Sequence, residues 1–70
     1  MTIQQCKYVL EILKRGSFNE ASKALFVAQS SLSASVKSLE EELHIKIFER
    51  SNSGIYLTGD GAEFVRGRTA

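Results

Sequence analysis

Residues 28–43 read AQSSLSASVKSLEEEL, and this stretch decides the fold of the 70-residue chain. Apolar residues recur in it at spacings of four, three and four: Leu32, Val36, Leu39 and Leu43. Such spacings place them on one buried stripe of an α-helix. At about 100° per residue, the opposite face is polar and centres on Ser30, Ala34, Lys37 and Glu41. The stretch therefore predicts an amphipathic helix over 29–43 with one face left for contact.

Two more helices are predicted upstream. The first has apolar residues at helical spacing: Ile3, Cys6, Val9, Leu10 and Leu13. Gly16 is a stop signal for it. Ser17 and Glu20 fit a capping box that starts a second helix, which runs to about Leu25 and buries Phe18, Ala21 and Leu25. Residues 26–28 then form the turn into the third helix. Two helices joined by so short a turn match a helix-turn-helix unit.

Downstream of His44 the pattern changes to short segments rich in strand formers, at 45–48 and 55–57, with a turn signal at 51–54 between them. These segments predict a small β-hairpin, or wing. Thr58 can cap a last helix whose inward side carries Ala62 and Val65. The predicted fold is mainly α: a winged helix-turn-helix with a three-helix core, a short β-hairpin wing and the start of a linker helix.

Composition excludes several classes of protein. The net charge is only +1, although residues 1–37 hold five basic and two acidic side chains. Cys6 is the only cysteine, which favours a reducing compartment. His44 and Asp60 are the only histidine and aspartate, so a nucleophile has few partners and one Cys with one His cannot form a zinc site. We expect no enzyme, no cofactor, no metal, no secretion signal and no membrane segment.

An ordered set of motifs runs through these elements. It comprises GSF at 16–18, ASKAL at 21–25, Val27, QSSLS at 29–33, LEEEL at 39–43, FER at 48–50, and Leu57, Thr58 and Gly61. In this order and spacing the chain resembles the N-terminal DNA-binding domain of LysR-type transcriptional regulators. The resemblance implies sequence-specific binding of double-stranded DNA in bacterial transcription regulation, in the cytoplasm, by homodimers or tetramers on partly palindromic sites. It divides the chain into a DNA-binding domain at 1–58 and the start of a linker or dimerisation helix at 59–70. A small-molecule effector would bind a C-terminal domain that this sequence does not contain.

The helix at 29–43 is then expected to enter the major groove, whose base edges its N-terminal residues reach first. Gln29 can pair with adenine, Ala34 can touch a thymine methyl, and Lys37 can reach a phosphate or a guanine. Arg50 and the turn place the wing, near residues 50–54, on the backbone or in the minor groove. The predicted DNA-binding residues are Ser17, Asn19, Gln29, Ser30, Ser31, Ser33, Ala34, Lys37, Arg50, Ser51 and Asn52.

Several residues leave alternatives open. The glutamates at 40–42 lie at the far end of the recognition helix, and we expect them to point away from the phosphates. Ala28, Ala34 and His44 depart from the family pattern, which more often has a capping hydroxyl, a long side chain and a glycine there. Ser30 and Lys46 depart from it too, at positions where the family often has proline. We expect Phe18, Phe26 and Phe48 in the core. A winged helix that binds a protein partner is the alternative function.

Overall fold

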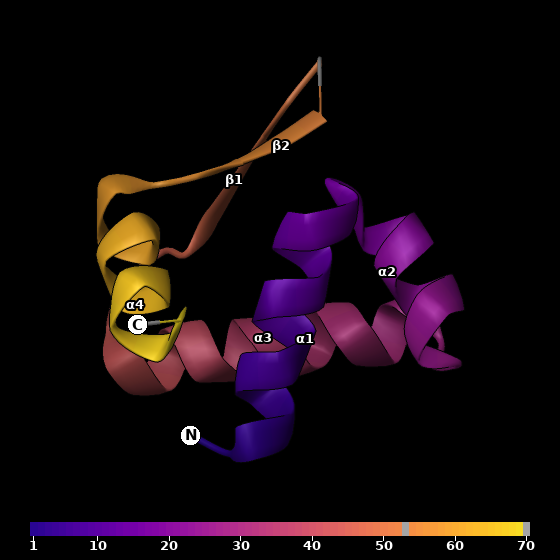
Figure 1. Cartoon of the computed structure of the whole chain (residues 1–70), viewed down its shortest axis with the longest axis horizontal. Helices are drawn as coiled ribbons and strands as arrows, with labels where there is room; N and C mark the ends of the chain where they lie inside the picture. The colour runs from indigo at the N-terminus through magenta and orange to yellow at the C-terminus, as the bar shows by residue number, and fades with distance from the viewer. Residues whose placement is uncertain (53, 70) are drawn as a thin grey trace.

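The computed structural model describes residues 1–52 and 54–69, and these residues form four helices and one antiparallel hairpin. The elements are α1 (Ile3–Arg15), α2 (Phe18–Leu25), α3 (Gln29–Leu43), β1 (Phe48–Ser51), β2 (Gly54–Leu57) and α4 (Gly59–Thr69). Figure 1 shows α1 crossing α3, with α2 near one end of α3, α4 near the other, and the hairpin projecting beyond the helices. This arrangement confirms the predicted mainly helical architecture.

The first helix begins and ends on sequence signals of different kinds. Thr2 accepts from the backbone N–H of Gln5 at 3.0 Å, and the Gln5 side chain accepts from the Thr2 N–H at 3.0 Å. These two bonds form a capping box that was not predicted from the sequence. At the other end Gly16 adopts the left-handed conformation, φ 73°, and donates to the Ile12 carbonyl at 2.8 Å, as the stop signal predicted.

The predicted capping box of α2 forms only in half. Ser17 accepts from the Glu20 N–H at 3.2 Å. The Glu20 carboxylate instead lies 3.6 Å from Lys23 Nζ, one turn further along the helix. Both side chains of this ion pair are exposed, so it contributes little to stability, and the helix start depends on the Ser17 hydroxyl.

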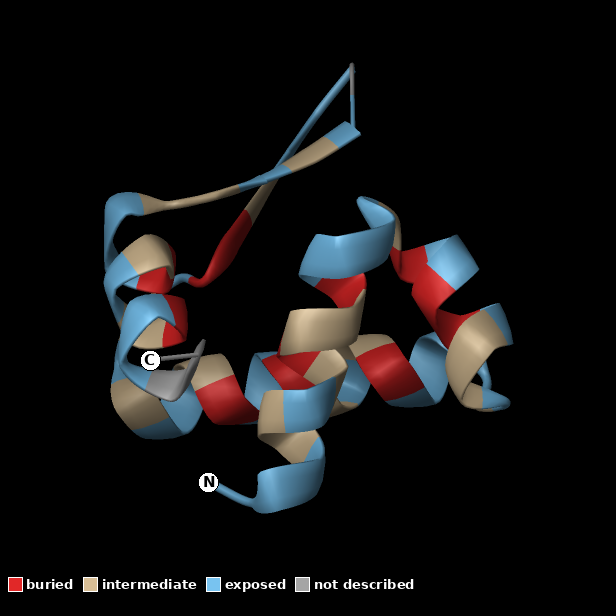
Figure 2. Cartoon of the chain, in the orientation of Figure 1, coloured by how far each residue is buried: buried red, intermediate tan, exposed pale blue. Residues whose placement is uncertain are grey.

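The core lies where the helices and the start of β1 face one another, as the buried positions in Figure 2 show. It consists of Val9, Ile12, Phe18, Ala21, Leu32, Val36, Leu39, Ile47, Phe48 and Val65. The stripe predicted for α3 is correct, with Leu43 only partly buried. On α1 the predicted stripe included Ile3 and Leu13, which are 79% and 41% exposed, and omitted Ile12, which is fully buried. Leu25 is also only partly buried.

Phe26 was wrongly expected in the core, because its side chain is 95% exposed. It caps the C-terminus of α2 in the left-handed conformation, with φ 58°. Its N–H turns back to the carbonyls of Lys23 and Ser22. That backbone reversal starts the turn into α3, and it directs the Phe26 ring away from the hydrophobic core.

His44 ends α3 in the same left-handed conformation, with φ 58° and ψ 37°. A residue with a Cβ is strained there, whereas glycine is not. We therefore expect His44→Gly to raise the free energy of unfolding by about 1 kcal/mol, measured by urea denaturation. His44→Ala keeps the Cβ and is the control. An equal gain in both variants would contradict the conformational explanation.

The base of the wing is held from two sides at Ile47. Its N–H donates to Glu40 Oε2 at 2.7 Å, and the next N–H, of Phe48, donates to the same oxygen at 3.2 Å. On the other side the Ile47 carbonyl accepts from the Thr58 N–H at 3.0 Å. Thr58 Oγ1 caps α4 by accepting from the Gly61 N–H at 2.9 Å, as its place in the sequence predicted. We call this arrangement the Ile47 clamp.

Above the clamp the two strands pair antiparallel, from Phe48 opposite Leu57 to Ser51 opposite Gly54. Of the predicted turn at 51–54, Ser53 lies outside the described residues. The second strand was predicted correctly to within one residue. The first was predicted too early, because only Phe48 of 45–48 belongs to β1, which continues to Ser51.

Candidate nucleic-acid interface

The polar face of α3 is open to solvent along its N-terminal half. Gln29, Ser30, Ser31, Ala34 and Lys37 are exposed, and Ser33 is partly buried. Ala28, the N-cap residue, makes no side-chain hydrogen bond to the first turn. Backbone N–H groups of that turn therefore have no side-chain cap, and such groups attract anions.

A first hollow lies between the start of α2, the start of α3 and the wing. Five of the predicted residues line it: Ser17, Asn19, Gln29, Arg50 and Ser51. Because the residues come from three elements far apart in the sequence, only the fold brings them together. The residues predicted to contact phosphates, the residue predicted to contact a base and the predicted wing residues therefore lie on one side of the molecule, around this hollow.

A second hollow separates the middle of α3 from the wing. Ser33, Lys37 and Arg50 line it, together with Lys46. Lys46 was not predicted as a site residue; its only sequence signal was a cation within the predicted strand segment 45–48. Glu40 and Glu49 also line this hollow, so its charge is mixed rather than uniformly positive.

The remaining predicted residues do not line either hollow. Ser30, Ser31 and Ala34 lie on the exposed face of α3, and Asn52 is exposed next to the end of β1. A flat, exposed helix face with short side chains is the shape that fits inside a groove. These four residues therefore remain candidates for DNA contact because they are exposed on this side. Unlike the other seven, they do not line a shared hollow.

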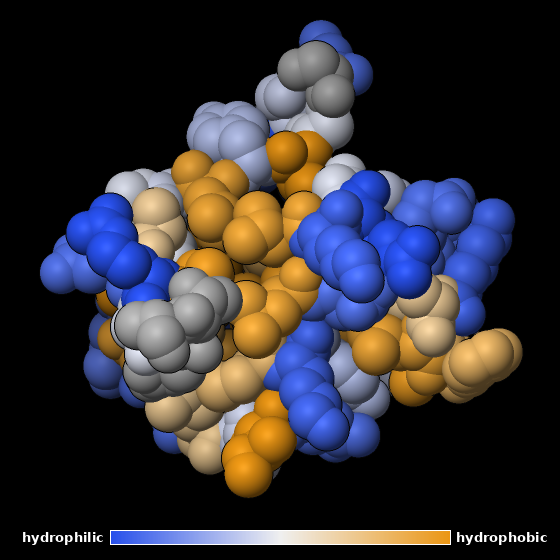
Figure 3. Space-filling model, viewed as in Figure 1, coloured by the Kyte–Doolittle hydropathy of each residue, from blue (hydrophilic) through white to orange (hydrophobic). Residues whose placement is uncertain are grey.

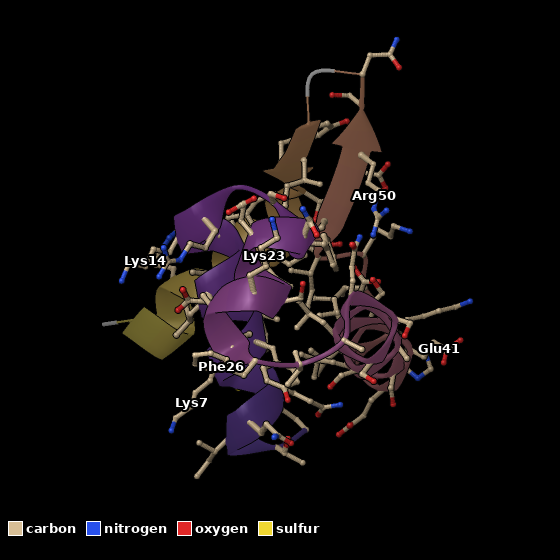
Figure 4. All side chains as sticks on the ribbon, turned by 90° about the vertical axis from the view of Figure 1, so that its right-hand side faces the viewer. Lys7, Lys14, Lys23, Phe26, Glu41 and Arg50 are labelled. Carbon is tan, nitrogen blue, oxygen red and sulfur yellow. The ribbon has the colours of Figure 1, made fainter. Side chains whose placement is uncertain are left out.

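Arg50 lines both hollows, and its guanidinium stacks on an aromatic ring. The Arg50 Cζ lies 4.5 Å from the centroid of the Phe18 ring. The Phe18 ring in turn meets Phe48 edge to face, with 5.8 Å between centroids and 76° between planes. Figure 4 shows Arg50 on the hairpin, on the side of the molecule where α3 lies.

The glutamates at 40–42 have three different surroundings. Glu40 is part of the Ile47 clamp, and Glu42 pairs with the N-terminal amine of Met1. Glu41 projects into solvent on the same side of the molecule as Arg50, as Figure 4 shows. The three glutamates therefore do not form one uniform acidic end. Glu41 lies about 18 Å from Gln29 along α3, at 1.5 Å per residue, and the expectation that this end points away from the phosphates stays a prediction.

The basic residues of α1 do not add to this side. Figure 4 shows Lys7 and Lys14 projecting from the side of the molecule opposite Arg50 and Glu41. Arg15 Nε is paired with Glu11 at 2.6 Å. The positive portion counted along the sequence is therefore spread over two faces of the fold.

Within residues 1–52 and 54–69, none of the helices is long and apolar enough to cross a membrane. Over the same described part of the chain, His, Cys, Asp and Glu side chains do not gather in threes as a metal ion would need.

Comparison with known proteins identifies the class. Residues 3–62 match the family model of bacterial regulatory helix-turn-helix proteins of the lysR family. A transcriptional regulator of Bacillus subtilis, YcgK, is 42% identical over 65 residues, which are 93% of this chain and 20% of that protein. The chain therefore belongs to the lysR family, and it spans about a fifth of the length of this relative.

Solved structures agree with this assignment. The LysR family transcriptional regulator CbnR superposes with a TM-score of 0.90 at 33% identity, over 96% of this chain and 23% of that one. The BenM DNA-binding domain, in a complex with catB site 1 DNA, superposes with a TM-score of 0.90 at 31% identity, over 96% and 75% of the two chains. The predicted winged helix-turn-helix is thereby confirmed. The relatives are transcriptional regulators, in agreement with the expectation that this chain is not an enzyme.

Proposed function

We propose that this domain binds specific sequences in double-stranded DNA and so regulates transcription. The observation that carries the proposal is the meeting of Gln29, Arg50 and the α2 start around one hollow beside the exposed face of α3, in a chain of the lysR family. An α-helix fits the major groove, and a wing beside it can follow the backbone or the minor groove.

The proposed docking places the N-terminal half of α3 in the major groove. Gln29 would read a base, the short Ser30, Ser33 and Ala34 would let the backbone approach, and Lys37 would meet a phosphate. Ser17 and Asn19 begin α2, whose N–H groups favour a phosphate on the neighbouring backbone. Arg50, Ser51 and Asn52 would contact the DNA from the wing. Ala34 cannot make the long-range base contact common in the family, so Gln29 and the wing carry more of the recognition.

The proposed assembly is a homodimer or tetramer of the whole protein on a partly palindromic site, with half-sites about one DNA turn apart. Residues 1–58 form the DNA-binding domain in this proposal, and 59–70 begin the dimerisation helix. Figure 3 supports a contact surface here, because apolar residues form a broad region between α4, α1 and the base of the hairpin. A small-molecule effector bound by another domain, and a cytoplasmic location, belong to the same proposal.

Selection of bound duplexes from a random pool, repeated at two salt concentrations, tests the function. A partly palindromic consensus supports specific reading by a dimer. DNA affinity should fall with salt, at a log–log slope of about −0.9 per phosphate contact. Failure to enrich any duplex, together with a partner protein bound independently of salt, would instead establish the alternative, a protein-binding winged helix.

Two substitutions should separate base reading from phosphate contact. Gln29→Ala should weaken binding to the selected consensus by about 1–3 kcal/mol and relax the preference at one base position. Lys37→Ala should weaken binding to all duplexes and reduce the salt slope by about one. Fluorescence anisotropy titrations over a range of salt concentrations measure both.

Lys14→Ala is the matched control for Lys37→Ala, because Lys14 lies on the opposite side of the molecule. Its salt slope should equal that of the wild type. If Lys14→Ala and Lys37→Ala lowered the slope equally, α3 would not be the docking face.

A further inference from the structure

We propose that Phe18 is a positioning residue for DNA recognition, because its ring holds the Arg50 guanidinium at the boundary between the two hollows. This inference rests on the proposed DNA binding. It gives Phe18, a core residue, a second role in addition to packing. Phe18 would act through Arg50 without touching DNA.

The contact has the geometry of a cation–π interaction. The Arg50 Cζ is 4.5 Å from the ring centroid of Phe18, inside the roughly 6 Å over which a ring attracts a cation. A guanidinium is planar and weakly hydrated, so it can stack on a ring while its N–H groups still face solvent. Arg50 is exposed as a residue, and these N–H groups therefore stay available to a phosphate or a base.

The ring itself has little freedom to move. Phe18 is 8% exposed and belongs to the core. Phe48 meets it edge to face at 5.8 Å between centroids. Phe48 and Arg50 are two residues apart in β1, so their side chains leave the same face of the strand. One strand face thus supplies both the residue that fixes the ring and the residue that stacks on it.

The stack determines where the wing cation lies relative to α3. Arg50 lines the first hollow with Gln29 and the second with Lys37. Without the ring, the long arginine side chain would sample many rotamers. Held on Phe18, its charge stays between the base-reading and the phosphate-binding positions of α3. The arrangement couples the wing contact to the helix contact through one aromatic side chain.

A double-mutant cycle tests this role, with a duplex from the random-pool selection as the probe. Phe18→Leu in the wild-type background should weaken binding roughly two- to five-fold, the value of an exposed cation–π contact. In the Arg50→Ala background the same change should have no further effect. Phe18→Tyr keeps the ring face and should restore most of the affinity. Arg15→Ala, which removes a cation paired with Glu11, should leave the cycle unchanged.

Equal losses from Phe18→Leu with and without Arg50 would overturn the inference and leave Phe18 as core packing alone. A second measurement needs no variant: ring current from Phe18 should shift the Arg50 Hε resonance of the free protein upfield, and an unshifted resonance would also overturn it. If the wild-type protein selects no duplex, the proposed function fails first. If it selects one and Arg50→Ala weakens binding without coupling to Phe18, only the positioning role fails.

Discussion

Replacing Gly61 with alanine is expected to destabilise the domain by about 1–3 kcal/mol, the usual cost of overpacking. A Cβ at this position would lie 2.2 Å from the carbonyl oxygen of Ile47 and 2.9 Å from its carbonyl carbon and Cα. All three are backbone atoms, so no flexible side chain can move aside. The carbonyl that would be displaced also accepts from the Thr58 N–H, and the substitution should therefore loosen the Ile47 clamp.

Gly67→Ala is the matched control on the same helix, because a methyl group added at this position would meet no described atom within 4 Å. Alanine favours a helix over glycine by up to about 1 kcal/mol, so this variant should be as stable as the wild type or slightly more stable. Chemical denaturation monitored by circular dichroism measures both. A Gly61→Ala variant as stable as Gly67→Ala would show that α4 does not pack tightly on Ile47.

Removing the Glu40 carboxylate is the second change with a large expected effect. Glu40→Ala leaves the N–H groups of Ile47 and Phe48 without the acceptor that each now has. An unsatisfied donor that is at least partly buried costs about 1–3 kcal/mol, and we expect a total loss of about 2–3 kcal/mol for the pair. The loss should appear in the free energy of unfolding from urea titrations.

Two controls isolate the acceptor role of Glu40. Glu40→Gln keeps one side-chain oxygen and should lose less than half as much stability. Glu41→Ala removes the exposed neighbouring glutamate and should stay within about 0.5 kcal/mol of the wild type. Equal stability of Glu40→Ala and Glu41→Ala would mean that the clamp contributes nothing to the fold.

Both substitutions should also reduce DNA affinity beyond the loss of folded protein. A two-stranded hairpin is marginally stable by itself, so the order of the wing depends on what holds its base. Glu40 fixes that base to α3, and Gly61 fixes it to α4. Affinity measured at temperatures where each variant is folded should therefore still fall.

The helices were predictable because their signals are local. Apolar spacing within α3, Gly16 at the end of α1 and the Ser17 hydroxyl at the start of α2 act over three or four residues. The turn residues likewise separated β1 from β2. Each of these features depends on neighbours in the chain, so one sequence suffices to find it.

The errors arose where distant parts of the chain meet or where the backbone reverses. An exposed Phe26 contradicts the usual burial of aromatic residues, because a left-handed turn points its ring outward. In the sequence Glu40 cannot be distinguished from Glu41 and Glu42. Its role depends on the chain reversal after α3, which places the Ile47 N–H against its carboxylate. Gly61 entered the sequence analysis only as a member of the family motif, whereas the structure places it against the backbone of Ile47. None of these facts has a short-range pattern.

The residues of the candidate site could be named from the sequence but their geometry could not, and their contact with DNA stays a prediction. Seven of the eleven predicted residues line the two hollows, and the family resemblance had supplied most of them. Lys46 was missed because nothing in the sequence shows that it faces α3 across the second hollow. The contact of Arg50 with Phe18 joins residues 32 positions apart and could come only from the fold.

The stack of Arg50 on Phe18 also has a consequence for the thermodynamics of association. A long, free side chain that becomes immobile on binding costs about 0.5–1.5 kcal/mol of conformational entropy. In this domain most of that entropy would already be lost when the protein folds, because the Phe18 ring restrains the Arg50 guanidinium before DNA binds. Calorimetry should then show a smaller entropic penalty for the wild type than for Phe18→Leu, so that a core aromatic residue would influence how favourably the domain meets its ligand.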